Sequence, residues 1–321
     1  MGMTPVLSKH TAFGFQIQEA EGTEASNAVI WIPVDGTVDF KKRVNRTFPR
    51  QADYVEGQHL HYSAGQWARG GRGFVLVPDA SVLGDLFEWI FDRDSYNQGA
   101  LATVYKYYER GGVGVWESFI DCKVGEATFT FEKGRPVGLG LSVVGRKPGT
   151  ATPAVSMASV TGPFLYKETG INVSYAGEVV AATTELERAE IRIDNRLEDP
   201  GEGLRLTSNA DGGKYPAHIY NLAAAEVSGS MTRDFVSDLL TTSFQAQADD
   251  DFGSNNDGQL VFALARGSAS ATITCNRVQW GEPGPDFPGD NETRITQDVE
   301  WTALMEDTAT DPTPALEYVV A

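Results

Sequence analysis

Two parts of this sequence match each other at a constant spacing of 153 residues, and this repetition limits what the chain can fold into. Shifted by 153 positions, Asp85-Leu86 falls on Asp238-Leu239, inside two segments whose apolar residues recur at helical spacing. The same shift, without a gap, places Cys122 on Cys275. A repeat about as long as an ordinary domain predicts two related modules in tandem.

The repeat divides the chain of 321 residues into five parts. A further match, Asn45-Arg46 with Asn195-Arg196, has a spacing of 150, and three extra residues in a loop of the second copy reconcile the two spacings. The stretch 148–163 is rich in Pro, Gly, Ala, Ser and Thr, which is typical of a linker. We therefore predict an N-terminal arm, a first module, this linker, a second module and an acidic C-terminal tail, at residues 1–26, 27–147, 148–163, 164–306 and 307–321.

Short runs with alternating apolar residues dominate both modules, and turn residues separate the runs. Val137 to Val143 and Leu260 to Leu264 are examples of such runs. Helical spacing of apolar residues is confined to Ser81–Phe91 and Asp234–Phe244. The sequence therefore predicts a mainly β protein made of two tandem β-sandwich or split-barrel modules, each with about one flanking α-helix.

The charge of the chain is strongly negative and unevenly distributed. Residues 1–150 carry 16 Lys+Arg and 17 Asp+Glu, a net of −1, and the remainder carries 10 and 27, a net of −17, which together give −18. Tight binding of DNA or RNA needs a basic surface, so this composition argues against it. The charge favours an acidic, solvated surface or a surface that meets DNA without holding it.

The sequence lacks the patterns of common catalytic and cofactor sites. It contains no phosphate-binding loop, dinucleotide glycine fingerprint, nucleophile elbow or His-Glu-x-x-His motif. The two cysteines are far apart and lie in apolar runs, which is typical of small buried side chains rather than of a disulfide or a metal site. We predict no enzymatic activity, no catalytic residue and no cofactor. A hydrolase with a carboxylate pair is the weakest alternative.

Two places invite a metal-site interpretation, and both are better explained otherwise. His59 and His61 alternate on a predicted strand, but Glu56 is the nearest carboxylate and no cysteine is close. The run Asp249–Asp251 lacks the alternating ligands and terminal Glu of a calcium-binding loop, so we interpret it as an acidic surface hairpin. The prediction is no bound metal.

Several motifs, in their order along the chain, resemble those of tail tube proteins of long-tailed bacteriophages. The stretches 10–18, 21–25 and 31–34 are similar to the opening of that family, which often reads Thr-Ala-hydrophobic-Gly, Gly-Thr-Pro-Ala and a strand ending in Pro-Val. Glu24 replaces the usual Pro. In the second module, 187–197 resembles the family's alternating strand that closes on Asp-Asn-x-Leu, and Val227-Ser228-Gly229-Ser230 resembles its Val-Ser-Gly-Ser strand.

This resemblance implies a structural virion protein located in the phage tail and assembled in the host cytoplasm. Six modules of the family form a ring whose inner sheets join into one β-barrel around a channel for DNA, and rings stack into a tube. Two tail-tube-like modules in one chain then imply trimeric, pseudo-hexameric rings. The implied partners are other copies of the chain, the tape measure, tail terminator and distal tail proteins, and double-stranded DNA in transient, non-specific contact.

Two groups of residues are candidates for roles in such an assembly. Glu190, Arg192 and Asp194 alternate with Ile191 and Ile193, so we expect them on one sheet face that lines the channel or a subunit seam. The segment that follows is longer than most connections, so we expect it to contact the adjacent ring or subunit. Its candidate residues are Glu198, Asp199, Glu202, Arg205, Asp211, Lys214 and Tyr215.

Other interpretations remain open from the sequence. Another virion component, such as a decoration or tail terminator protein, or the tube of a contractile injection machine, shares the β-sandwich fold. A carbohydrate-binding β-sandwich module is an alternative of a different class, because the chain has six tryptophans that could stack on sugars. No apolar run is long enough to cross a bilayer and the N-terminus lacks the pattern of a signal peptide, so we expect no membrane insertion.

Overall fold

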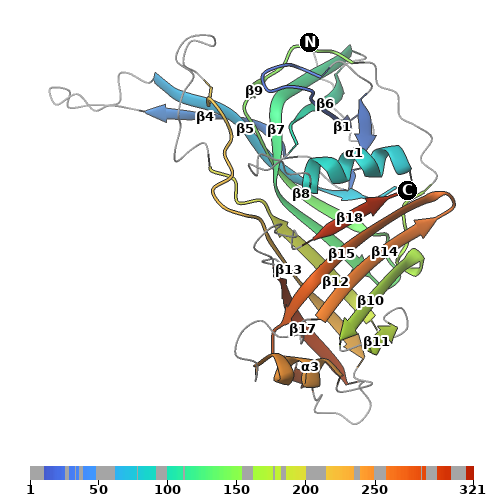
Figure 1. Cartoon of the computed structure of the whole chain (residues 1–321). Coiled ribbons are helices and arrows are strands. Elements are labelled where there is room, and N and C mark those ends of the chain that lie inside the picture. Colours follow the sequence, from blue (N-terminus) through green and yellow to red (C-terminus); the bar gives the residue numbers. More distant parts are fainter. Residues whose placement is uncertain are drawn as a thin grey trace.

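The computed structural model of the chain is mainly β, as the sequence predicts, with a large antiparallel sheet and few helices (Figure 1). It describes most of the chain, in segments separated by gaps. The described residues are 11–25, 29–32, 34–35, 39–47, 62–77, 79–91, 100–110, 113–153, 162–175, 178–181, 186–199, 215–234, 239–248, 258–282, 284–286, 295–304 and 316–321.

Strands from the N-terminal half of the chain pair in one continuous order, which we call the first ladder. The order is β2–β1–β6–β7–β8–β5, and both β3 and β4 pair with the far side of β5. The bounds are β1 Thr11–Ile17, β2 Ile30–Ile32, β3 Val34–Asp35, β4 Lys41–Thr47, β5 Tyr62–Val75, β6 Ala102–Arg110, β7 Val113–Glu132 and β8 Gly138–Gly145. In Figure 1 the hairpin of β4 and β5 projects away from the body of the molecule.

Strands from the C-terminal half repeat this order, and we call them the second ladder. The order is β11–β10–β14–β15–β17–β13–β12. The bounds are β10 Thr169–Tyr175, β11 Glu178–Ala181, β12 Leu186–Asp194, β13 Glu226–Asp234, β14 Gly258–Arg266, β15 Ala269–Trp280 and β17 Thr296–Ala303, with a short β16 at Gly284–Asp286 beside β17. Every pairing of the second ladder is antiparallel, as in the first.

The repetition extends to one further short strand in each ladder. In the first, β9 (Lys147–Pro148) pairs with β7, where Ile120 faces Lys147. In the second, β18 (Glu317–Val320) pairs with β15, where Ile273 faces Tyr318. Because Ile120 and Ile273 are 153 residues apart, β9 and β18 occupy the same place in the two ladders.

Core positions of the two ladders also correspond at a shift of 153 residues. Cys122 and Cys275 are buried at the same place in β7 and β15. When the pairings are followed outward, Ala127 matches Trp280 and Phe40 matches Ile193, all of them buried. At this shift Asn195 falls on Lys42, so the ladders do not keep the match of Asn195 with Asn45.

Helix α1 (Ala80–Phe91) lies where the two ladders meet (Figure 1). The Asp79 carboxylate accepts hydrogen bonds from the main-chain N–H groups of Ser81 and Val82, at 3.0 and 3.3 Å, and so caps the first turn. Five of the helix's side chains are buried, and Tyr318 of β18 contacts Phe87 edge-on and stacks on Phe91. The C-terminal strand therefore joins the second ladder to the helix of the first.

A second helix, α3 (Leu239–Ala248), lies at the end of the second ladder that is remote from α1 (Figure 1). It overlaps the predicted helical segment Asp234–Phe244 from Leu239 onward and ends four residues beyond that segment, at Ala248, while residues 235–238 lie outside the described residues. Phe244 packs against the core. No helix in the described segments is long and apolar enough to span a membrane.

Candidate assembly surfaces

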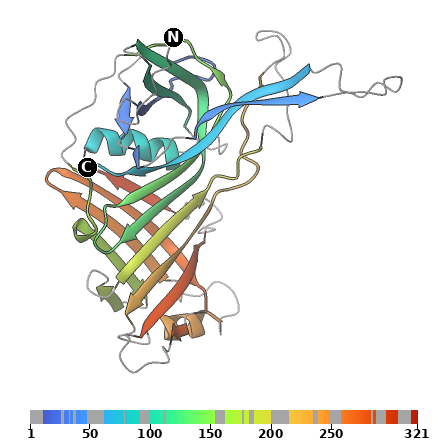
Figure 2. The same ribbon diagram turned by 180° about the vertical axis from the view of Figure 1, so that it is seen from behind.

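The two ladders are joined within the chain by the pairing of β7 with β12. We call this pairing the seam, as distinct from a contact between subunits. The register runs from Glu126 opposite Asp194 to Glu132 opposite Arg188. At its start the main-chain N–H of Asn195 donates to the carbonyl of Gly125 at 2.8 Å. Strands β8, β7, β12, β13 and β17 therefore form one sheet that crosses both halves of the chain, and Figure 2 shows them side by side.

The side chain of Asn195 ties the seam to helix α1. Its Nδ2 donates to the carbonyl of Ile90, at 3.1 Å, and to the carbonyl of Val124, at 2.9 Å. The first of these carbonyls belongs to the last turn of α1, where main-chain acceptors have no partner within the helix. One buried side chain thus fixes the relative position of the helix, β7 and the start of the seam.

The residues expected on one face of this region alternate along β12 as predicted. Glu190, Arg192 and Asp194 are half-buried or exposed, whereas Ile191 and Ile193 are fully buried. Arg192 forms an ion pair across the seam with Glu126, with 3.1 Å between Nε and Oε1. Both side chains are substantially exposed, so this ion pair contributes little to the free energy of folding. Its main consequence is that it places one positive and one negative charge on this face.

The same face is polar over all five strands of the shared sheet, and we call it the polar face. On each strand the residues that turn away from the core are Gly, Ser, Thr or charged. They are Gly138, Gly140 and Ser142 of β8, Glu126, Thr128, Thr130 and Glu132 of β7, Arg188, Glu190, Arg192 and Asp194 of β12, Glu226, Ser228, Ser230 and Thr232 of β13, and Thr296, Asp298, Glu300 and Thr302 of β17. Seven carboxylates face two arginines in this set, so the polar face is net negative.

A buried polar cluster lies beside the seam, around Asp121 of β7. Its Oδ1 accepts hydrogen bonds from Nε2 of Gln18 at 3.0 Å and from the main-chain N–H of Gly22 at 2.7 Å. Its Oδ2 accepts from Nε of Arg146 at 2.6 Å. Asp121 also has a positive φ of 55°, a conformation that Asp and Asn tolerate better than most residues.

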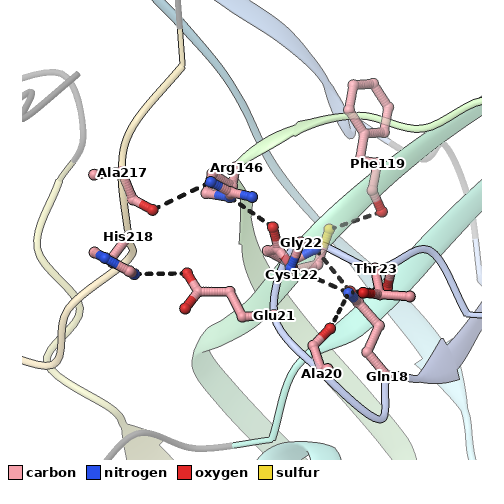
Figure 3. Close-up of polar contacts among 11 residues, drawn as sticks. Gln18, Ala20, Glu21, Gly22, Thr23, Phe119, Cys122, Arg146, Ala217 and His218 are labelled. Carbon is pink, nitrogen blue, oxygen red and sulfur yellow. Dashed lines mark hydrogen bonds and ion pairs between the residues drawn. The ribbon is translucent and has the colours of Figure 1, made fainter. Parts of the chain in front are cut away.

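The cluster connects the N-terminal segment to the segment 215–222 of the second half. Arg146 donates from Nη1 to the carbonyl of Ala217 at 3.2 Å, and Glu21 contacts Nδ1 of His218 at 2.7 Å (Figure 3). Close by, Nζ of Lys123 donates to Oδ1 of Asn221 at 3.1 Å. Segments from three distant parts of the sequence are thereby held at one end of the polar face.

Segment 215–222 is one side of the long β12–β13 connection. At the base of that connection, the segment is hydrogen-bonded to the residues that follow β12. Leu197 pairs with Asn221 as an isolated bridge, and Glu198 N donates to the carbonyl of Tyr220 at 2.8 Å. Asp199 forms an ion pair with Arg69 of β5. Of the residues expected to contact the adjacent ring or subunit, Glu198, Asp199 and Tyr215 thus lie at the base, and Glu202, Arg205, Asp211 and Lys214 lie outside the described residues.

A second set of contacts holds the N-terminal segment against the start of the linker. The Glu24 carboxylate accepts hydrogen bonds from the main-chain N–H groups of Thr150 and Ala151, at 2.9 Å each, and from the hydroxyl of Ser118 at 3.0 Å. Burial acts to raise the pKa of Glu24, but these hydrogen bonds favour the charged form more strongly, so its pKa lies below its usual value. The residue that departs from the tail tube pattern therefore has a partner of its own.

The sequence did not single out Gln18, Asp121, Arg146 or Glu24 for a structural role. The available signal was small: at the shift of 153 residues, Asp121 falls on Thr274 within otherwise matching strands. A charged residue in a buried strand requires a partner, but the sequence does not show where that partner lies.

Three of the six tryptophans are buried in the core, and the other three are half-buried in the first ladder. Trp89, Trp280 and Trp301 are buried, and Nε1 of Trp89 donates to the carbonyl of Cys122 at 3.0 Å. Trp31 and Trp116 contact each other in the first ladder, with ring centroids 5.7 Å apart. Half of the six tryptophans are thus unavailable for stacking on a sugar.

The described residues contain no group of three or more His, Cys, Asp or Glu side chains placed to hold a metal ion. His59, His61 and Asp249–Asp251, the places considered for a metal, lie outside the described residues.

Comparison with known proteins gives one family match. A family model described as "Phage tail tube protein" matches residues 48–303, which is most of the chain and covers the seam, the polar face and the β12–β13 connection. No curated protein matches the chain.

Proposed function

We propose that this chain, which belongs to the phage tail tube protein family, assembles into closed rings that stack into the tube through which DNA leaves the virion. Family membership makes it a structural component of a phage tail that assembles with itself and with other tail proteins. The ring, the channel and the passage of DNA are our proposal, and the polar face is the observation that carries it.

The repeated ladders support a ring in which each chain fills two positions. Both ladders have the same order of strands, and core positions correspond at one shift of 153 residues. We infer that they arose by duplication and that residues 27–147 and 164–306 are equivalent modules. If a ring of this family has six module positions, three chains complete it.

The polar face is suited to line the channel. Its opposite side carries the buried apolar residues of both ladders, such as Phe129 and Ile191, so one side of the sheet packs the core and the other meets water. The excess of carboxylates repels DNA phosphates, and the neutral Ser, Thr and Gly positions offer no cationic anchor. Such a wall lets DNA pass without binding it.

The base of the β12–β13 connection is suited to present a loop to the next ring. Contacts with Arg69, Lys123 and Arg146 of the first half fix both sides of that base. We propose that residues 200–213 contact the adjacent ring or subunit. The tape measure, tail terminator and distal tail proteins are proposed partners on family grounds, as is assembly in the host cytoplasm.

Negative-stain electron microscopy of the purified protein over a range of concentrations tests this function. Stacked rings with a central channel are the expected result. Single rings that never stack would instead favour a tail terminator, and a monomer at all concentrations would contradict the proposal.

A further inference from the structure

Near the C-terminal end of β15, one side of the strand has no neighbouring strand among the described residues. A side chain caps the main-chain groups there. Beyond Gly258, which pairs with Val278, no strand among the described residues lies along this side. Instead, Gln247 of α3 donates from Nε2 to the carbonyl of Val278 at 2.9 Å, and its Oε1 accepts from the main-chain N–H of Trp280 at 2.9 Å. One side-chain amide thus satisfies a donor and an acceptor that a neighbouring strand normally uses.

The corresponding place in the first ladder is the seam. Shifted by 153 residues, Val278 falls on Gly125 and Trp280 on Ala127. At the seam the carbonyl of Gly125 accepts from the main-chain N–H of Asn195, and Ala127 lies opposite Ile193. The amide of Gln247 therefore occupies the position that the main chain of β12 occupies within the chain.

The counterpart of β12 in the first ladder is β4 with the residues before it, and no strand in the described part of the chain pairs with the side of β4 that turns away from β5. Asp39 N donates to the carbonyl of Gly71, at 3.4 Å, so the main-chain groups of the alternate residues Phe40 and Lys42 turn away from β5. The carbonyl of Phe40 is capped by Nζ of Lys106 at 3.4 Å. Each of the two open sides is therefore covered by one long polar side chain.

We propose that these two sides pair with each other between copies of the chain, in the register of the seam. Trp280 of one chain lies opposite Phe40 of the next, Gln279 opposite Lys41, and Val278 opposite Lys42. The main chain of the incoming strand replaces the caps formed by Gln247 and Lys106. This proposal rests on the ring proposed above and specifies how that ring closes.

Side-chain direction and charge both agree with this register. Phe40 and Trp280 are buried, as are Ile193 and Ala127 at the seam, whereas Lys41 and Gln279 are exposed. The strand β4 reads Lys41-Lys42-Arg43-Val44-Asn45-Arg46-Thr47 and has no acidic residue, whereas residues 151–321 carry a net charge of −17. A basic strand facing a strongly acidic half favours a second copy of this chain as the partner.

Paired cysteines test the register. At the seam the pair 125–195 is hydrogen-bonded, so 126–194 is a pair without hydrogen bonds, whose Cα atoms lie about 4.5 Å apart and suit a disulfide. The equivalent pair between chains is 279–41. The variant Gln279→Cys/Lys41→Cys is assembled and oxidised, and its products are separated under non-reducing conditions. The matched controls are Gln279→Cys/Arg43→Cys, which is two residues out of register, and Glu126→Cys/Asp194→Cys, which cross-links within one chain.

The proposal predicts that most of the in-register variant becomes covalent dimers and trimers in tubes and stays monomeric in unassembled protein. The out-of-register variant and the wild type, whose two cysteines are buried, give little cross-linking. Tubes that form normally without the in-register cross-link, or with an equal yield from the out-of-register variant, overturn this register but not the ring. If none of the variants nor the wild type forms rings or tubes, the proposed function itself fails.

Discussion

Nε of Arg146 lies 2.6 Å from Oδ2 of Asp121, and both side chains are more than nine-tenths buried. The pair is completed by Gln18 and Gly22 on the carboxylate and by the carbonyl of Ala217 on the guanidinium. Because a buried ion pair is stable only when its remaining donors and acceptors are satisfied, these three segments depend on one another. The arrangement couples the N-terminal segment to the base of the β12–β13 connection.

Removal of Arg146 leaves the Asp121 carboxylate buried without its counter-ion. We expect Arg146→Met to lower the free energy of unfolding by about 3–5 kcal/mol, measured by denaturant titration of the unassembled chain. Asp121→Asn with Arg146→Met is the matched control, because the amide needs no counter-ion and Asn tolerates the positive φ. A loss below about 1 kcal/mol for Arg146→Met alone contradicts this account of the cluster.

Glu24 makes the contact between the N-terminal segment and the linker depend on pH. Its pKa in the folded chain is lower than the usual value of 4.5, so the contribution of its charged form is present above that value and is lost as the pH falls through the folded-state pKa. We expect Glu24→Gln to destabilise the chain by roughly 1 kcal/mol near pH 7, because the contacts are partly exposed. The difference from the wild type should shrink below pH 4.5. An equal difference at pH 7 and at pH 3 would show that the charge is irrelevant.

Chemical labelling of the variant Ser230→Cys tests whether the polar face lines the channel. Ser230 is exposed on β13, so in unassembled Ser230→Cys we expect labelling by both a small maleimide and a maleimide carrying a large polymer. In tubes the small reagent still reacts through the channel, while labelling by the large reagent falls at least tenfold. Equal labelling by the large reagent before and after assembly would place the polar face on the outside.

The β12–β13 connection is expected to be needed for polymerisation but not for folding. Deletion of residues 200–213 leaves in place the contacts of Leu197 with Asn221 and of Arg146 with Ala217, which hold the base of the connection. We expect a soluble chain with an unchanged unfolding transition that forms no tubes by sedimentation. Normal tubes from this deletion variant would remove the connection from the assembly contacts.

The sequence predicted features that depend on local patterns. Alternation along Glu190–Asp194 predicted which residues turn away from the core, and helical spacing predicted α1 to within one residue at its start. The repeat predicted that Cys122 and Cys275 are equivalent and unpaired, as the structure shows. Each of these features is set by neighbouring residues or by a direct comparison along the chain.

Features that depend on distant pairing were not predicted. The seam joins Glu126 to Asp194, and which strand lies beside β7 is decided by the packing of whole ladders rather than by either strand. The partners of Asp121 lie 103 and 25 residues away, at Gln18 and Arg146, so no local pattern connects them. The sequence does not predict β18 within the acidic tail 307–321, because a run of four residues is too short to show a period.

The rotational symmetry of the assembled tube tests the central claim most directly. Cryo-electron microscopy of tubes grown from the purified chain should show three chains in each ring, six alternating module positions, and the polar face of β8, β7, β12, β13 and β17 around the channel. A ring of six chains, or a ring in which this face points away from the channel, would contradict the claim that the chain is a fused pair of tube modules.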